Sequence, residues 1–214
     1  MIQSTTSNWK PRSETVSNGY IKRIHGLRIH LLSSLLLLML LPAGAEELQA
    51  ERPYQIEVSK GSRELRVMQG EQMVTSFHIS YGMGGKGDKS RQGDNKTPVG
   101  NYRVMNFKLD SKFYLFMHLD YPNLVDAWHG YQNGVISAEE FRGIMGAYHR
   151  YETPPQDTPL GGYIGIHGIG EYTPEKVRSH EMYNWTEGCI ALRNEEINEL
   201  KKYISIGTRV VISD

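Results

Sequence analysis

Residues 54–70 read YQIEVSKGSRELRVMQG, and the alternation of apolar and polar side chains in this stretch indicates how the fold begins. Apolar side chains stand at every second position on both sides of a Gly-Ser turn, namely Tyr54, Ile56, Val58, Leu65 and Val67. A period of two is typical of half-buried strands. A third segment of the same kind runs from Val74 to Tyr81. Residues 54–82 therefore predict a meander of three short antiparallel strands.

Further strands are expected where apolar residues stand between turn residues, at residues 102–105, 113–118, 163–168 and 209–212. Three helices are expected among them. The first follows a capping box of Ser137 and Glu140 and runs through Tyr148, with residues 119–135 before it expected to be loop. The second begins at Pro174, and the third is capped by Asn194 and runs to about Tyr203. The chain is thus predicted to be mainly β, of the α+β class.

Residues 82–97 form a polar, glycine-rich segment. A phosphate-binding loop requires Gly, four residues, Gly, Lys and then Ser or Thr. Here Asp88 follows Gly82 and Gly87, so that the lysine comes one position late. Nucleotide binding is therefore disfavoured, and the segment is expected to be a long flexible connection between strands.

The first 45 residues differ from the rest and have the pattern of an export signal. Basic residues precede an apolar run from Leu31 to Leu41, and Ala43 to Ala45 supply a small-residue cleavage site. An uncleaved membrane anchor is the alternative, but a membrane span needs roughly 20 apolar residues, and this run is shorter. We expect a signal peptide at 1–45, a short linker at 46–53 and one domain at 54–214. The mature protein would then be exported to the periplasm or cell envelope, with no stable membrane span.

The charge balance limits the classes of partner. The leader holds five of the 24 basic residues and one of the 24 acidic residues, so that the mature chain would have 19 basic against 23 acidic residues. Nucleic-acid binding usually requires a basic patch that neutralises phosphates. We therefore expect no nucleic-acid partner.

Cys189 is the one cysteine in the sequence. Exported proteins tend to pair their cysteines, so a single thiol is buried and inert, pairs between chains, or reacts. A reactive thiol needs a base, and His167 is attractive because it ends an apolar strand and is followed by Gly168. His180 competes because it is nearer to Cys189 in sequence. The residues alone do not decide between the two histidines.

A family resemblance adds to this reasoning. The Ile166-His167-Gly168 segment, followed by the 186–194 segment TEGCIALRN, resembles the signature of the YkuD-type L,D-transpeptidases. The Thr-Pro-Val-Gly segment at 97–100 resembles a second stretch of that family. The resemblance covers about residues 54–212, and it is nearest to an exported subgroup with a long insertion, here residues 106–162, before the histidine. It implies a YkuD-like β-sandwich with a few peripheral helices.

The resemblance also implies roles for individual residues. Cys189 would be the nucleophile and His167 its base, with the Gly168 carbonyl orienting the imidazole. Backbone N–H groups near Gly188 and Cys189 would hold the oxyanion. Thr186 and Arg193 are candidate substrate-binding residues, although a capping or surface role for Arg193 is an equal alternative.

Two positions depart from the family pattern. Glu187 stands where the family usually has a histidine, and Ala191 stands where many members have an arginine. These departures affect substrate placement more than the nucleophile. They also keep open a non-catalytic module that binds the cell wall.

The resemblance implies a peptidoglycan L,D-transpeptidase that forms a thioester on stem peptides during cell-wall remodelling. One alternative is a cysteine hydrolase of the same fold that cuts stem peptides or releases a protein linked to the wall. A zinc peptidase is disfavoured because the sequence has no His-x-x-x-His or comparable ligand spacing. We therefore expect no metal and no cofactor, with stem peptides and a wall-linked protein as the candidate partners.

Overall fold

The computed structural model describes residues 53–214, so the predicted leader and most of the predicted linker lie outside the described residues. Within this range, no helix is both long enough and apolar enough to cross a membrane.

The chain begins with the predicted meander. Strands β1 (Tyr54–Ser59), β2 (Glu64–Gln69) and β3 (Gln72–His78) pair in antiparallel order. Ile56 pairs with Val67 and Val58 with Leu65, and all four side chains are buried. The apolar residues of the alternating pattern therefore face the core, as their period predicted.

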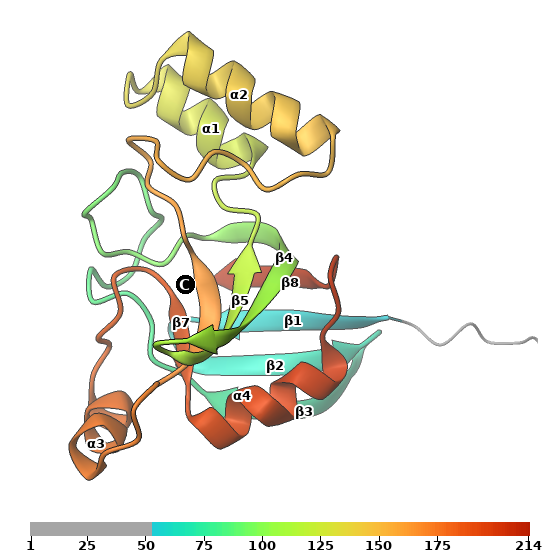
Figure 1. The fold of residues 1–214 in the computed structure, drawn as a ribbon, viewed down its shortest axis with the longest axis vertical. Coiled ribbons are helices and arrows are strands. Elements are labelled where there is room, and N and C mark those ends of the chain that lie inside the picture. The colour runs from blue at the N-terminus through green and yellow to red at the C-terminus, as the bar shows by residue number, and fades with distance from the viewer. Residues whose placement is uncertain (1–52) are drawn as a thin grey trace, which may run out of the picture. The chain divides into compact units, whose positions relative to one another are not determined.

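Five more strands complete one mixed sheet in the order β3-β2-β1-β8-β4-β5-β6-β7 (Figure 1). They are β4 (Gly100–Ser111), β5 (Tyr114–Leu119), β6 (Gly165–Gly168), β7 (Ile190–Leu192) and β8 (Arg209–Ser213). The long strand β4 joins two halves of the sheet, because residues 100–103 pair with β8 and residues 104–111 pair with β5.

The two halves enclose one hydrophobic cluster, to which Ile56 and Val210 contribute from one half and Met117 and Ile166 from the other. The edges of the sheet also approach each other, since Ser80, just after β3, pairs with Ala191 of β7. The expected mainly β fold with a few peripheral helices is confirmed.

Four α-helices surround the sheet: α1 (Leu124–Gln132), α2 (Ala138–His149), α3 (Pro174–Met182) and α4 (Asn194–Leu200). Helix α2 has the predicted capping box, in which Ser137 and Glu140 bond reciprocally. Helix α3 has Pro174 in its first turn, as predicted.

Two expectations for the helices were wrong. The segment read as loop before residue 135 contains α1, which begins at a capping box of Asn123 and Asp126. Helix α4 has Arg193, and not Asn194, at its N-cap, and it gives way to a 3-10 turn (Lys201–Tyr203). Asn194 does not cap because its side chain binds both the N–H and the carbonyl of Gly170.

The predicted insertion at residues 106–162 divides between two parts of the structure. Residues up to 119 belong to β4 and β5 of the sheet. The remainder contains α1 and α2, whose small core consists of Ala127, Ile136, Ile144 and Leu160. This helical hairpin lies next to one end of the sheet (Figure 1).

Candidate active site

The register of β6 and β7 places Cys189 close to His167. The two strands are parallel, with Ile166 opposite Ile190 and His167 opposite Ala191. Side chains alternate between the faces of a strand, so residues two apart share a face. His167 therefore shares a face with Ala191, and Cys189 is the residue that immediately precedes β7, two positions before Ala191.

His167 is held in one orientation. Its side chain is only 1% exposed, and its ring stacks on Phe113 with the centroids 4.3 Å apart. The Nδ1 atom lies 2.7 Å from the Gly168 carbonyl oxygen. Because a carbonyl can only accept, Nδ1 carries the hydrogen and Nε2 keeps a free lone pair.

Burial lowers the pKa of His167 to about 4, and the hydrogen bond to Gly168 acts in the opposite direction. The imidazole is therefore neutral near pH 7. A neutral ring with a free Nε2 lone pair can accept a proton, as a general base must.

Cys189 is half-buried, and its thiol donates to the Tyr163 carbonyl oxygen at 3.4 Å. Burial raises the pKa of the thiol to about 11, and the nearby Glu187 carboxylate raises it further. The Gly165 N–H and the Lys89 ammonium lower the pKa of Cys189, but these effects are smaller than that of burial. Near pH 7, Cys189 is therefore a thiol and His167 a neutral imidazole.

The loop before Cys189 is fixed by Thr186 and Gly188. The buried Thr186 hydroxyl donates to the Cys189 carbonyl oxygen at 2.6 Å and accepts from the Gly188 N–H at 3.2 Å. Gly188 has a φ of +135°, and a Cβ atom there would lie 2.8 Å from the Lys96 carbonyl oxygen. Glycine is therefore required for both its backbone angle and its space.

The two backbone N–H groups expected to hold an oxyanion differ in their hydrogen bonds. The Gly188 N–H is already bonded to Thr186. The Cys189 N–H makes no hydrogen bond within residues 53–214. Of these two groups, the Cys189 N–H is therefore the one without a hydrogen-bond partner among the described residues.

The glycine-rich segment at 82–97 lines the site, although sequence reasoning treated it only as a flexible connection. Lys89 is buried and donates to Asp94 at 2.7 Å and to the Arg91 carbonyl at 3.0 Å. The Thr97 hydroxyl accepts from the Gly82 N–H at 2.9 Å and donates to the Cys189 carbonyl at 3.4 Å. The Thr-Pro-Val-Gly stretch was the one signal that this segment belongs to the site.

Arg193 is held by its own helix. Its guanidinium lies 2.7 Å from Glu196 and 3.6 Å from Glu195, with the side chain 38% exposed. This arrangement is the capping or surface role that the sequence left open. Glu187 is exposed and Ala191 is buried in β7.

His180, the competing histidine, lies in α3 and is 1% exposed. A positive charge on His180 would lower the pKa of His167. Neither ring nitrogen of His180 has a hydrogen-bond partner among the described residues. Nothing fixes its tautomer, whereas Gly168 fixes that of His167, and this difference favours His167 as the base.

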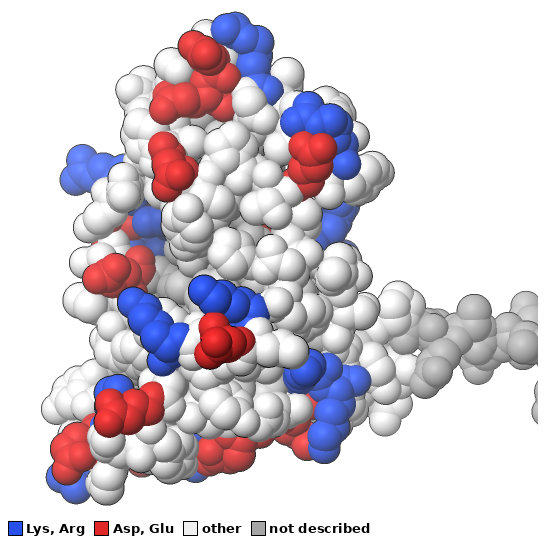
Figure 2. Space-filling view, viewed as in Figure 1, with Lys and Arg blue, Asp and Glu red and all other residues white. Residues whose placement is uncertain are grey.

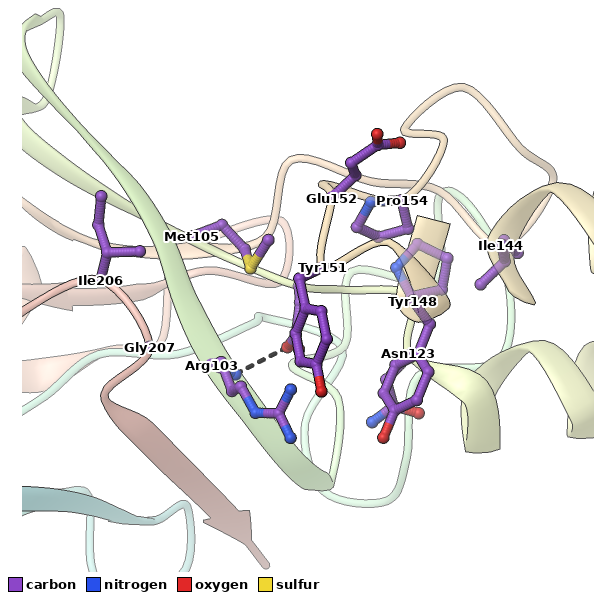
Figure 3. Close-up of a pocket in the computed structure, with 12 residues that line it drawn as sticks. Arg103, Met105, Asn123, Ile144, Tyr148, Tyr151, Glu152, Pro154, Ile206 and Gly207 are labelled. Atoms are coloured by element: carbon purple, nitrogen blue, oxygen red, sulfur yellow. Dashed lines mark hydrogen bonds between the residues drawn. The ribbon is translucent and has the colours of Figure 1, made fainter. Parts of the chain in front are cut away.

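Residues 53–214 hold no group of three or more His, Cys, Asp or Glu side chains arranged to bind a metal ion. A separate hollow lies between the helical hairpin and the sheet (Figure 3). It is lined mainly by apolar groups, including Met105, Ile144, Tyr148 and Tyr151, and contains neither Cys189 nor His167.

The structure is a β-rich domain with the imidazole of His167 on β6 and the thiol of Cys189 immediately before the parallel neighbour β7. A family model described as the L,D-transpeptidase catalytic domain matches residues 53–212, and the chain belongs to this family.

Individual relatives are similar over parts of their length. YafK of Escherichia coli (strain K12) is 40% identical over 86 residues, which cover 37% of this chain and 35% of YafK. Pgp2 of Campylobacter jejuni, described as a helical cell shape determining protein, is 22% identical with a TM-score of 0.50. That match covers 77% of this chain and 49% of Pgp2, and it shows the fold. The chain thus spans about half or less of these relatives.

Proposed function

We propose that this protein is a peptidoglycan L,D-transpeptidase in which Cys189 forms a thioester with a stem peptide. One observation carries the proposal: His167, with its Nδ1 fixed 2.7 Å from the Gly168 carbonyl, lies on the strand that pairs with β7, and Cys189 immediately precedes β7. A fixed base beside a thiol is the arrangement that nucleophilic catalysis requires. Family membership supplies the reaction class.

In the first step, the Cys189 sulfur attacks a peptide carbonyl carbon of the stem while His167 Nε2 takes the thiol proton. The tetrahedral oxyanion accepts a hydrogen bond from the Cys189 N–H. The carbon–nitrogen bond then breaks, and His167 returns the proton to the leaving amine of the terminal D-residue. The product of this step is a thioester between Cys189 and the stem peptide.

In the second step, an acceptor attacks the thioester and His167 takes the acceptor's proton. The carbon–sulfur bond breaks, and the sulfur recovers the proton from His167. An amine acceptor gives a new cross-link, whereas water gives hydrolysis. Because His167 takes the thiol proton as the sulfur attacks, neither step needs a thiolate that is formed beforehand.

We further propose that the protein is exported and works in the periplasm or cell envelope, with residues 1–45 as its signal peptide. The charge distribution supports a substrate other than nucleic acid. On the face shown in Figure 2, acidic and basic side chains are interspersed without a continuous basic patch. Stem peptides are the proposed substrate, and a protein linked to them is a further candidate partner.

The test is to incubate the mature protein with purified muropeptides and to follow the products and the protein by mass spectrometry. We expect an acyl adduct on Cys189, no adduct with Cys189→Ala, and loss of turnover with His167→Gln. Added D-amino acid should be incorporated if amines act as acceptors, whereas shortened stems alone would indicate hydrolysis.

Two results would contradict the proposal. Turnover that persists in Cys189→Ala would exclude the thioester mechanism. Muropeptide binding without turnover or adduct in the folded wild-type protein would favour a binding module.

A further inference from the structure

A tryptophan beside the catalytic pair has a hydrogen-bond donor without a partner. Trp185 precedes Cys189 by four residues, and its ring stands edge to face with that of His167, with centroids 5.9 Å apart. Its Nε1–H is buried and finds no acceptor within residues 53–214. Buried indole N–H groups usually have a partner, so this donor calls for an explanation.

Hydrogen bonds hold the loop that carries Trp185 on both sides of this residue. The Asn184 side chain accepts from the Tyr81 N–H at 3.3 Å. Thr186 donates its N–H to the Tyr81 carbonyl at 3.2 Å and accepts from the Met83 N–H at 2.8 Å. The chain on both sides of Trp185 is therefore held in place before a ligand arrives, which limits the entropy lost on binding.

Other buried polar atoms without partners are less informative. They belong to His118, Thr158 and His180. A histidine can change its tautomer and a hydroxyl can rotate, so these groups can adapt to several partners, whereas an indole N–H can only donate. His180 is also fully enclosed, whereas Trp185 is half-buried as a residue, although its Nε1 atom is buried.

We propose that the Trp185 Nε1–H binds a backbone carbonyl oxygen of the donor stem peptide beside the bond that Cys189 attacks. A donor-only group selects an acceptor atom. A peptide carbonyl fits a neutral indole better than a carboxylate does, because a buried carboxylate needs a charged partner. Trp185 is thus a substrate-contact residue that sequence reasoning missed. This inference rests on the proposed function, since it takes a stem peptide as the ligand.

The test separates binding from chemistry by using the inactive Cys189→Ala protein as background. Trp185→Phe removes the N–H, and the matched control is Trp128→Phe, which alters an exposed tryptophan of helix α1. We expect muropeptide Kd, measured by calorimetry, to rise about tenfold with Trp185→Phe and to stay within twofold with Trp128→Phe.

A structural role for Trp185 predicts a different outcome. If the N–H served only the fold, Trp185→Phe would lower Tm and leave Kd unchanged. We expect Tm to be unchanged or higher, because the substitution removes a buried donor that has no partner in the free protein. In the protein that keeps Cys189, Trp185→Phe should raise KM. The value of kcat and the pH profile of activity should be unchanged.

A second variant covers the case in which Trp185→Phe packs poorly. Replacing Trp185 with benzothienylalanine keeps the shape of the ring and exchanges the N–H for sulfur, and the same rise in Kd is expected. An unchanged Kd in this variant overturns the inference. The same result is expected if an ordered water, and not the peptide, accepts the hydrogen bond of the N–H. Failure of the proposed function can be distinguished from failure of this inference, because the wild-type protein would then form no acyl adduct on Cys189.

Discussion

At the scale of single residues, Glu187 places a negative charge near the thiol of Cys189, the proposed nucleophile. Its carboxylate raises the pKa of Cys189, in addition to the larger effect of burial. Glu187→Gln should lower that pKa, and the iodoacetamide alkylation rate at pH 8 should rise roughly threefold, as expected for one solvent-screened charge. Rates can be followed by intact-protein mass spectrometry.

The exposed Glu71, in the turn between β2 and β3, provides the control. Glu71→Gln should leave the alkylation rate unchanged. Equal rates for wild type and Glu187→Gln would show that the carboxylate does not act on the thiol.

Gly188 has a positive φ angle, and there is no space for a side chain at this position. Gly188→Ala should lower the free energy of unfolding by more than about 2 kcal/mol, because it adds a close contact with the Lys96 carbonyl to the backbone strain. The control is Gly85→Ala, where φ is +80° but no atom lies within 4 Å of the added Cβ. That variant should lose only about 1 kcal/mol. Urea unfolding measures both, and equal losses would contradict the steric argument.

At the scale of the elements, Asn194 connects helix α4 to the segment that follows β6. Its side chain accepts from the Gly170 N–H at 3.2 Å and donates to the Gly170 carbonyl at 2.7 Å. Because Gly170 lies three residues after His167, this pair of bonds supports the end of the strand that carries His167, the proposed base.

Asn194→Ala should lower the free energy of unfolding by roughly 1 to 3 kcal/mol, since it leaves both Gly170 groups without partners. We also expect kcat to fall more than KM rises, because the imidazole loses support. Asn198→Ala on the same helix removes one exposed bond to Tyr114 and should have little effect. Denaturation and steady-state kinetics test this, and identical behaviour of the two variants would refute it.

At the scale of the whole molecule, buried histidines should make the fold sensitive to acid. Burial lowers the pKa values of His167 and His180 to about 4 in the folded protein, below the usual 6.5. The unfolded chain therefore binds more protons between these values, so that stability falls as pH decreases from about 6.5 to 4. Each histidine can contribute roughly 3 kcal/mol over this window.

One buried carboxylate acts in the opposite sense. Burial raises the pKa of Asp126 to about 7, so that this group favours the folded state at low pH. A single variant isolates the histidine effect. Between pH 7.5 and 4.5, His180→Phe should lose roughly 2 to 3 kcal/mol less stability than wild type, as measured by urea unfolding. Parallel pH profiles would contradict the assignment.

The sequence by itself determined most of the elements, because their signals are local. The alternation from Tyr54 to Val67 requires one buried face, and the Ser137–Glu140 capping box starts a helix wherever it stands. Helix α1 was missed because its signal, Asn123 and Asp126, follows a proline-containing turn that reads as loop. The lone Cys189 was evident from composition, whereas His167 was selected through the family resemblance.

Only the tertiary structure decided how the site works. Loop geometry decides that the Gly188 N–H binds Thr186 and that the Trp185 N–H has no partner. Contact between segments that are distant in sequence decides that Lys89 lowers the pKa of Cys189. The protonation of Cys189 and His167 was also beyond the sequence, because burial sets both pKa values and burial depends on the assembled fold. Residue types thus determined which groups could react, and packing determined their charge and the hydrogen bonds they make.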